Sequence, residues 1–223
     1  MPDPAVAPSA PRLPDDPAAG EIRSLTHDAV LGEVELRSLE LCGQDARGVK
    51  LDSARVGDCD LSSSRLDALR LIDCAIQGCD LANLLARGAG LRRVEIADSR
   101  LTGVSLLDGK LADVTVRGCR ADLASLAGAS LSRVTFEDCV LVESSFMETA
   151  LESVRFVRCD LTAADFRGAR IDRCEFRRNR LSAVQGLSSL RGAAMEWPDV
   201  VELAGELAAA LGIDTLDDPN DAA

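Results

Sequence analysis

The sequence is poor in the large and reactive side chains on which aromatic cores and many active sites depend. Its 223 residues include no Tyr, a single Trp, five Phe and one His. His27 has no recognisable nucleophile or base partner, so we interpret it as an ordinary surface or capping residue. No P-loop, glycine-rich dinucleotide turn or metal-spaced Cys/His cluster is present either. We therefore expect a non-enzymatic protein with no metal and no cofactor, and a core that is narrow or finely divided.

Long apolar runs and internal prolines are also missing. No stretch of about eighteen apolar residues occurs, and the N-terminus lacks a basic segment followed by an apolar one. The sequence thus predicts neither a membrane span nor a signal peptide, and we expect a cytoplasmic protein. Between Pro17 and Pro198 there is no proline, so no residue in this stretch lacks a backbone hydrogen-bond donor.

The formal charge of −12 is concentrated near the two ends of the chain. Residues 1–30 carry a net −3 and residues 186–223 a net −7, whereas the long middle carries only −2. Residues 1–20 contain six prolines among alanines and aspartates, a composition that buries too little apolar surface to offset the entropy of ordering. The sequence therefore predicts a flexible tail over residues 1–20.

The middle of the chain repeats every five residues. From Leu31 to Leu181, every residue whose number ends in 1 or 6 is apolar. Residues five apart on an α-helix diverge by about 140°, and on a flat strand they alternate between faces, so neither element buries this pattern. A chain that turns a corner every five residues does bury it. Mostly small residues lie two positions before each apolar centre, and no charged residue falls in either of these inward columns.

The length of one coil follows from residues of the same type that stack on one another. Twenty residues per coil places Phe136, Phe156 and Phe176 in one column and Phe146 and Phe166 in another. The same spacing also aligns five cysteines: Cys59, Cys79, Cys119, Cys139 and Cys159. The pairs Cys59/Cys74 and Cys159/Cys174 are spaced for a three-sided coil of fifteen instead. The columns favour four sides, which gives nearly eight coils stacked into a rod.

Individual units resemble a known repeat. Cys59-Asp60-Leu61-Ser62-Ser63, Cys79-Asp80-Leu81-Ala82-Asn83 and Ala164-Asp165-Phe166-Arg167-Gly168 are similar to the A(D/N)LXX unit of pentapeptide-repeat proteins. The resemblance covers about two-thirds of the chain. It implies a right-handed quadrilateral parallel β-helix over residues 21–195. Some members of that family mimic double-stranded DNA and bind DNA gyrase, which makes gyrase a candidate partner.

After Leu181 the repeat slips by one residue, and a helix is expected beyond it. Ser188-Ser189-Leu190 and Ala193-Ala194-Met195 look like two further units displaced by one position. Pro198 suits a first helical residue, so residues 199–211 are expected to form an α-helix that Gly212 ends, within a unit spanning residues 196–213. Residues 214–223 read as an acidic tail. The helix either caps the last coil or pairs two copies into a homodimer, through these side chains: Trp197, Val200, Leu203, Leu207 and Leu211.

The eight cysteines are expected to be structural. Seven of them lie in the small inward column, where a free cysteine behaves as a compact apolar residue, and only Cys42 lies outside it. A reducing cytoplasm and a filled core argue against disulfide bridges between stacked pairs. We therefore expect free thiols that fill the core.

Two binding hypotheses remain open from the sequence. One outward column of a single side is apolar on successive coils and forms a candidate protein-binding patch: Leu85, Leu107, Ala127 and Met147. The alternatives for this patch are coverage by the N-terminal segment or by the last helix, and ordinary scattered apolar surface. The other hypothesis is gyrase binding by DNA mimicry, which needs a long ridge of negative charge, whereas the charged columns here are mixed. Direct nucleic-acid binding is not expected for a body that is nearly neutral.

Overall fold

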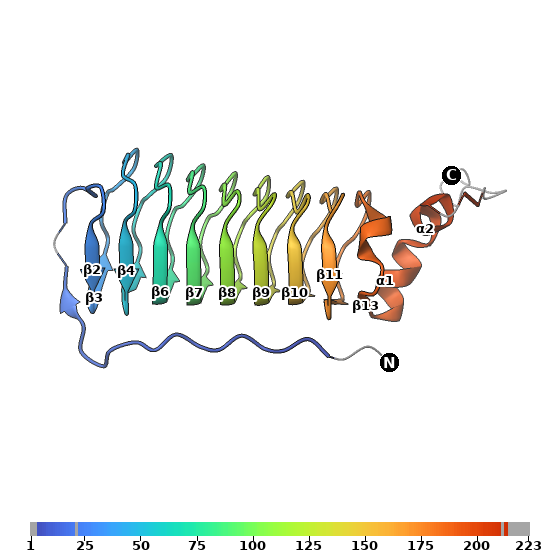
Figure 1. The fold of residues 1–223 in the computed structure, drawn as a ribbon, viewed down its shortest axis with the longest axis horizontal. Coiled ribbons are helices and arrows are strands. Elements are labelled where there is room, and N and C mark those ends of the chain that lie inside the picture. The colour runs from blue at the N-terminus through green and yellow to red at the C-terminus, as the bar shows by residue number, and fades with distance from the viewer. Residues whose placement is uncertain (1–3, 21, 211, 214–223) are drawn as a thin grey trace.

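The computed structural model describes residues 4–20, 22–210 and 212–213. In these ranges the chain forms a straight rod of stacked coils with short helices at its C-terminal end (Figure 1). Within the same ranges no helix combines the length and the apolar character needed to cross a bilayer. The elements are β1 (Ala18–Ala19), β2 (Val30–Gly32), β3 (Val34–Arg37), β4 (Lys50–Asp52), β5 (Arg55–Gly57), β6 (Arg70–Gln77), β7 (Gly90–Ala97), β8 (Lys110–Arg117), β9 (Ser130–Glu137), β10 (Ala150–Val157), β11 (Arg170–Asp172), β12 (Glu175–Arg177), the 3₁₀-helix η1 (Leu187–Leu190), β13 (Ala194–Met195), α1 (Trp197–Glu202) and α2 (Ala204–Ala210).

Each coil has four sides and twenty residues, as the sequence predicts. In the coil of residues 70–89, side 1 contains residues 70–72 and side 2 residues 75–77, both within β6. Side 3 carries Asp80 and side 4 carries Leu85, which pair with Arg100 and Ser105 of the next coil. All pairing is parallel and offset by twenty along the body of the rod, for example Leu71 with Leu91. The three-sided alternative is therefore excluded.

The corners between sides depend on a residue with positive φ. These residues have numbers ending in 3 or 8, such as Asp73 (φ 51°), Asp113 (φ 57°) and Asp138 (φ 53°). Asp, Asn and Gly tolerate this left-handed conformation better than most residues. The apolar residue two positions before each corner points inward. Because the chain turns at the corner, the apolar residue three positions after it points inward as well.

The rod has about nine turns, one more than the strict period predicts. The additional turn is the displaced one, because β13 pairs Glu175 with Ala194 and Phe176 with Met195, an offset of nineteen residues in place of twenty. The predicted slip by one residue is confirmed there. The preceding unit takes the form of η1, in which Leu190 is buried.

The interior changes character along the rod. Toward the C-terminus Phe156 stacks on Phe136 and Phe176 with ring centroids 5.2 and 5.0 Å apart. Phe146 and Phe166 form a second stack, with centroids 4.9 Å apart. Toward the N-terminus the core is filled by Leu, Ile and Val, and these side chains surround an apolar cavity of about 100 Å³.

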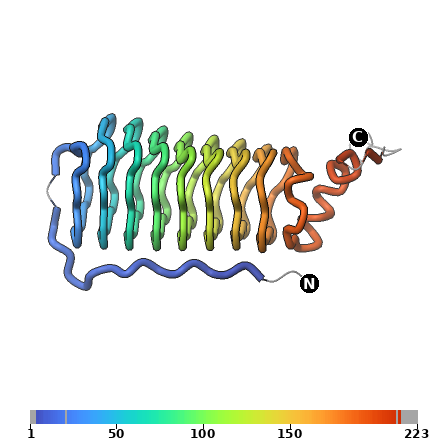
Figure 2. The backbone as a smooth tube through the Cα atoms, viewed as in Figure 1, coloured from blue at the N-terminus to red at the C-terminus, as the bar shows by residue number. Residues whose placement is uncertain are grey.

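The N-terminal segment lies along the rod, which differs from the flexible tail that the sequence suggested. Residues 4–17, which we call the strap, run lengthwise beside the coils, from the C-terminal end back to the N-terminal end (Figure 2). At that end β1 pairs with β3. His27, expected to be a surface or capping residue, is exposed and accepts a hydrogen bond from the Arg47 amide at Nδ1 (3.0 Å). Composition alone missed the strap because the rod supplies its hydrogen-bond partners.

The C-terminal helix is interrupted where a single helix was expected. α1 ends before Leu203, which is fully buried against the last coil, and α2 continues from Ala204. The amide of Ile213 donates to the Ala208 carbonyl (2.9 Å) and Gly212 has a φ of 71°, so the expected glycine stop is confirmed. Leu211 and the acidic tail at 214–223 lie outside the described residues.

Candidate interaction surfaces

The predicted apolar patch lies on side 4 of four successive coils. Leu107, Ala127 and Met147 occupy equivalent outward positions and are half-buried, and Leu85 lies one coil before them with 41% of its surface exposed. The flanking residues Ser105, Ser125 and Ser145 pair in register, which fixes the spacing of the column. The hydrogen bonds of the described strap residues go to sides 1 and 2 or the corner between them, not to side 4. The strap therefore leaves the patch uncovered.

Charged residues border the patch at both ends. Arg87 forms an ion pair with Asp108 (2.8 Å) next to Leu107. Arg167 pairs with Asp165 and places its Nη2 3.9 Å from the Met147 sulfur. An apolar centre with a charged rim is the usual composition of a protein-binding surface.

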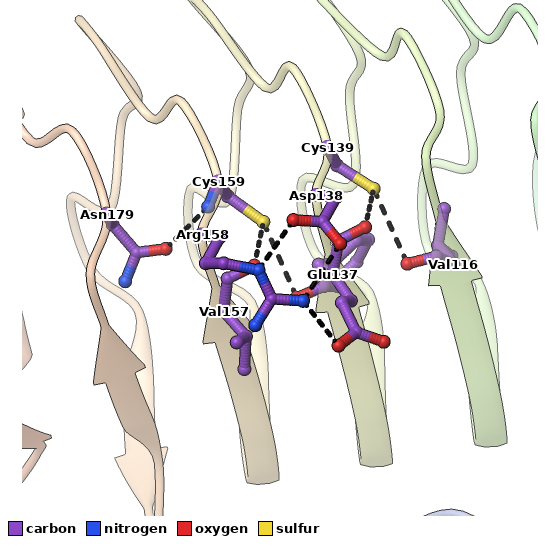
Figure 3. Close-up of polar contacts among 9 residues, drawn as sticks. Val116, Glu137, Asp138, Cys139, Val157, Arg158, Cys159 and Asn179 are labelled. Atoms are coloured by element: carbon purple, nitrogen blue, oxygen red, sulfur yellow. Dashed lines mark hydrogen bonds and ion pairs between the residues drawn. The ribbon is translucent and has the colours of Figure 1, made fainter.

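The charges of the body are largely paired between neighbouring coils. Arg158 donates to both Asp138 oxygens (2.7 and 2.9 Å) and to Glu137 (2.7 Å), as Figure 3 shows. Arg100 pairs in the same way with Asp80 of the preceding coil (3.2 Å). Such pairs place a base beside several of the acids and interrupt a ridge of one sign along the rod.

The strap is fixed to the rod by carboxylates at one corner and by arginines on side 2. The amides of Ser9 and Arg12 donate to Asp113 Oδ1 (3.1 Å) and Asp73 Oδ1 (2.9 Å). Arg133 donates to both oxygens of Asp113, at 2.7 Å each. The guanidinium of Arg133, with the Ser9 amide, holds the pKa of Asp113 at about 2 despite its burial. These carboxylates are therefore ionised and correctly oriented at neutral pH.

Further contacts fix the two ends of the strap. At its start the Ala5 amide donates to Glu175 Oε1 (2.9 Å), and Arg155 donates to the Ala5 carbonyl (2.6 Å). At its end Arg55 donates to the Pro14 carbonyl (3.0 Å). We call the rod residues that bind the strap the strap-binding surface: Arg55, Asp73, Asp113, Arg155 and Glu175.

The cysteines are free and, except for Cys42, buried. Cys139 donates to the carbonyls of Glu137 (3.2 Å) and Val116 (3.4 Å), the latter in the preceding coil (Figure 3). Burial raises the pKa of Cys74 and Cys174 to about 11, which keeps these thiols protonated. The expected structural role of the inward cysteines is confirmed.

The residues proposed for a cap or dimer divide into two groups. Leu203 and Leu207 pack against the core of the last coil, whereas Trp197 is 76% exposed and Val200 is half-buried. Asp199 is also buried, and its Oδ1 accepts the Asn179 amide (3.0 Å). Burial raises the pKa of this carboxyl. The helices thus cap the rod through their leucines and acids.

Sequence reasoning missed the strap-binding surface and the role of Asp199. Asp199 and Glu202 both bind the end of the rod, and Glu202 accepts the Leu181 amide (2.8 Å). A signal for the strap is present in the sequence. Asp73 and Asp113 occupy the same corner two coils apart, and Pro8, Pro11, Pro14 and Pro17 recur every third residue.

Comparison with known proteins identifies the repeat. Residues 122–185 match the family described as pentapeptide repeat region. The chain carries a pentapeptide repeat region. The same twenty-residue pairing extends on both sides of the matched stretch, from β2 to β12, so all these coils share the pentapeptide-repeat architecture. No curated protein matches the sequence.

Several solved structures match the chain at low sequence identity. HetL, a pentapeptide repeat protein from the cyanobacterium Nostoc, is 19% identical over 76% of this chain and 90% of its own, with a TM-score of 0.28. A trypsin-treated form of the fluoroquinolone resistance protein QnrB1 is 16% identical over 86% of this chain and 100% of its own, with a TM-score of 0.38. Rfr23 from the cyanobacterium Cyanothece is 12% identical over 78% of this chain and 92% of its own, with a TM-score of 0.19. Similarities at this level say nothing about what the present chain binds.

Proposed function

We propose that this chain is a non-enzymatic protein-interaction module that binds a protein partner through the side-4 patch. The patch supports this proposal because its apolar side chains are stacked at the coil spacing and no described segment covers them. The rod fixes that spacing through its backbone ladder, so the patch is rigid before binding. A rigid surface loses little conformational entropy when a partner docks.

The test is a pair of charge substitutions, Leu107→Asp and Met147→Asp. Both residues point outward, so we expect the rod of the double variant to fold. The partner is first identified by crosslinking through a photoreactive residue at Ala127. Its affinity for the double variant should be at least tenfold lower than for the unaltered chain. Val142→Asp is the matched control, because Val142 is a half-buried outward residue on side 3. If the double variant binds the crosslinked partner as well as the unaltered chain does, the side-4 patch is not the interface.

A second candidate function is binding to DNA gyrase by mimicry of DNA charge. One observation favours it: Glu40, Asp60 and Asp80 stack on successive coils of side 3 and pair in register. The run ends at Arg100, so it is short. We expect the purified protein to inhibit gyrase supercoiling at micromolar concentration. Substitution of the three acidic residues by lysine should abolish this inhibition. An unaltered supercoiling rate excludes the candidate.

A homodimer through the C-terminal helix remains a further proposal. Since Leu203 and Leu207 are occupied by capping, the contact would use Trp197, which is exposed, and Val200. Light scattering should then report twice the chain mass, and Trp197→Ser should restore the monomer mass. A monomer before any substitution refutes it.

A further inference from the structure

The rod recognises the strap through the strap's backbone. Ala5, Ser9 and Arg12 each donate a main-chain amide, and the carbonyls of Ala5 and Pro14 accept from arginines. The small Ala5 side chain is buried at one end. Recognition of this kind depends on the conformation of the bound segment more than on its side chains.

The strap's proline spacing matches the coil spacing of the rod. A polyproline II helix has three residues per turn and rises about 9.3 Å per turn. Two coils of parallel strands rise about 9.6 Å at a spacing of about 4.8 Å. Asp73 and Asp113 are two coils apart, and their donors, Arg12 and Ser9, are three residues apart. One turn of such a helix therefore spans the distance from the first carboxylate to the second.

The prolines preset this conformation. Pro8, Pro11 and Pro14 fix φ near −65°, and each restricts the residue before it to extended conformations. The residue after Pro8 and the residue after Pro11 supply the two amide donors. In each triplet, one residue fixes the conformation and the next makes the hydrogen bond.

The strap-binding surface is built independently of the strap. Arg93 and Arg133, each one coil beyond its aspartate, orient Asp73 and Asp113 through paired hydrogen bonds. On side 2 the outward residues between Arg55 and Arg155 are the small Ala75, Thr115 and Thr135, and Glu95, which pairs with Arg117. The acceptors, the two arginine donors and the mostly small residues between these arginines thus all come from the rod.

We propose that the strap-binding surface is a docking site for proline-rich segments of a partner protein, with proline at every third residue in the polyproline II conformation. The strap is its intramolecular occupant, and a partner segment binds when it displaces the strap. This site is separate from the side-4 patch, so a partner engaging it does not depend on that patch. A tethered occupant acts at an effective concentration in the millimolar range, so displacement requires a loosened strap or a tightly binding segment.

The test uses the full chain with Pro8→Gly, Pro11→Gly and Pro14→Gly, which removes the preset conformation of the strap without altering the rod. The probe is a fluorescein-labelled peptide with the sequence of residues 2–17, followed by fluorescence anisotropy. We expect it to bind the glycine variant at least tenfold more tightly than the unaltered chain, whose own strap occupies the surface. A peptide of the same composition with its prolines made adjacent should bind at least tenfold more weakly.

A second set of variants locates the site. In the glycine variant, Asp73→Ser with Asp113→Ser should weaken peptide binding at least tenfold. Serine is tolerated at this corner, because Ser53 and Ser153 occupy it with a φ of 55°. Asp138→Ser is the matched control, since Asp138 has the same corner conformation and an arginine partner one coil beyond. It is not among the strap's hydrogen-bond partners.

Four outcomes overturn the proposal. In the first, the peptide does not bind the glycine variant at millimolar concentration, and in the second, the peptide with adjacent prolines binds as tightly as the original peptide. In the third, Asp138→Ser weakens peptide binding as much as the pair Asp73→Ser and Asp113→Ser does. In the fourth, that pair leaves peptide binding unchanged. A dimer of the unaltered chain that Asp73→Ser with Asp113→Ser dissociates would assign the surface to the strap of a second copy instead.

Discussion

The two halves of the rod share one backbone and differ in what fills it. In the C-terminal half, from residue 130 onward, Phe146, Phe156, Phe166 and Phe176 have no exposed surface, and their rings meet in stacked and edge-to-face pairs. In the N-terminal half the corresponding positions hold Leu, Ile, Val and Ala, and a cavity of about 100 Å³ lies among the core side chains. The strand ladder and the corners continue through both halves, so the backbone fixes the available volume and the side chains determine how well it is filled.

This difference shows that, in a solenoid, the register of the strand ladder does not depend on how tightly the core side chains are packed. Val116 pairs directly with Phe136 in the next coil, and both residues line the cavity, so the cavity reaches the first ring of the phenylalanine stack. Each coil contacts mainly its neighbours, and the stability of such a rod is close to a sum of local terms. We therefore expect equivalent substitutions to change the free energy of unfolding by different amounts in the two halves.

The largest expected loss of stability comes from removal of a phenylalanine ring in the C-terminal half. Phe156→Ala should lower the free energy of unfolding by about 3–5 kcal/mol, because it removes a fully buried ring with two stacked neighbours. Ile96→Ala, at the equivalent position three coils earlier, should cost nearer to about 2 kcal/mol because its neighbours already border empty space. Urea denaturation followed by far-UV circular dichroism measures both, since the single Trp197 reports only one end. Equal losses would show that the cavity has no effect on the local response.

A smaller and opposite effect is expected from filling the cavity. Val116→Phe extends the Phe136 stack by one coil into the space that Val116 lines, and a favourable aromatic pair contributes about 0.5–1.5 kcal/mol beyond its area. The midpoint of denaturation should rise. Leu151→Phe is the contrasting control, because Leu151 is buried in the filled half and should lose about 1–3 kcal/mol through overpacking. A fall in both variants would mean that the cavity cannot accept a ring.

The smallest effect concerns the end of the filled half. The pKa of Asp199 is raised by burial, so ionisation of this group opposes folding at any pH above its folded-state pKa, and the effect vanishes below the ordinary Asp value of about 3.9. Asp199→Asn keeps an oxygen for the Asn179 amide and should raise the denaturation midpoint at pH 7. At pH 3 the gain should be absent. A lower midpoint at pH 7 would show that the charge itself stabilises the cap.

Much of the fold follows from the sequence because the repeat is local. The columns of Phe136, Phe156 and Phe176 determine the number of sides, and the apolar period places the core. The cavity does not follow, because its size depends on the combined volume of side chains from several coils. The break at Leu203 depends on the leucine's fit into the last coil. The strap depends on carboxylates that become neighbours only after the rod has formed.

The apolar patch could be placed from the sequence because position in the period gives the side and the direction of each residue. Leu107 and Met147 are outward on side 4, as expected. The division between Trp197, which is exposed, and Leu203, which is buried, could not be predicted from a single uninterrupted helix.

The C-terminal cap also determines the length of the particle. Asn179 and Leu181 flank Arg180, which pairs with Asp160, and their amides donate to the side chains of Asp199 and Glu202. In the preceding coil the equivalent amides of Cys159 and Leu161 donate to the Asn179 side chain and to the Arg180 carbonyl. An uncapped end would be a template for addition of further chains, as in a fibril. The helices at this end therefore block the addition of further chains to the ladder, and they limit the rod to a defined length.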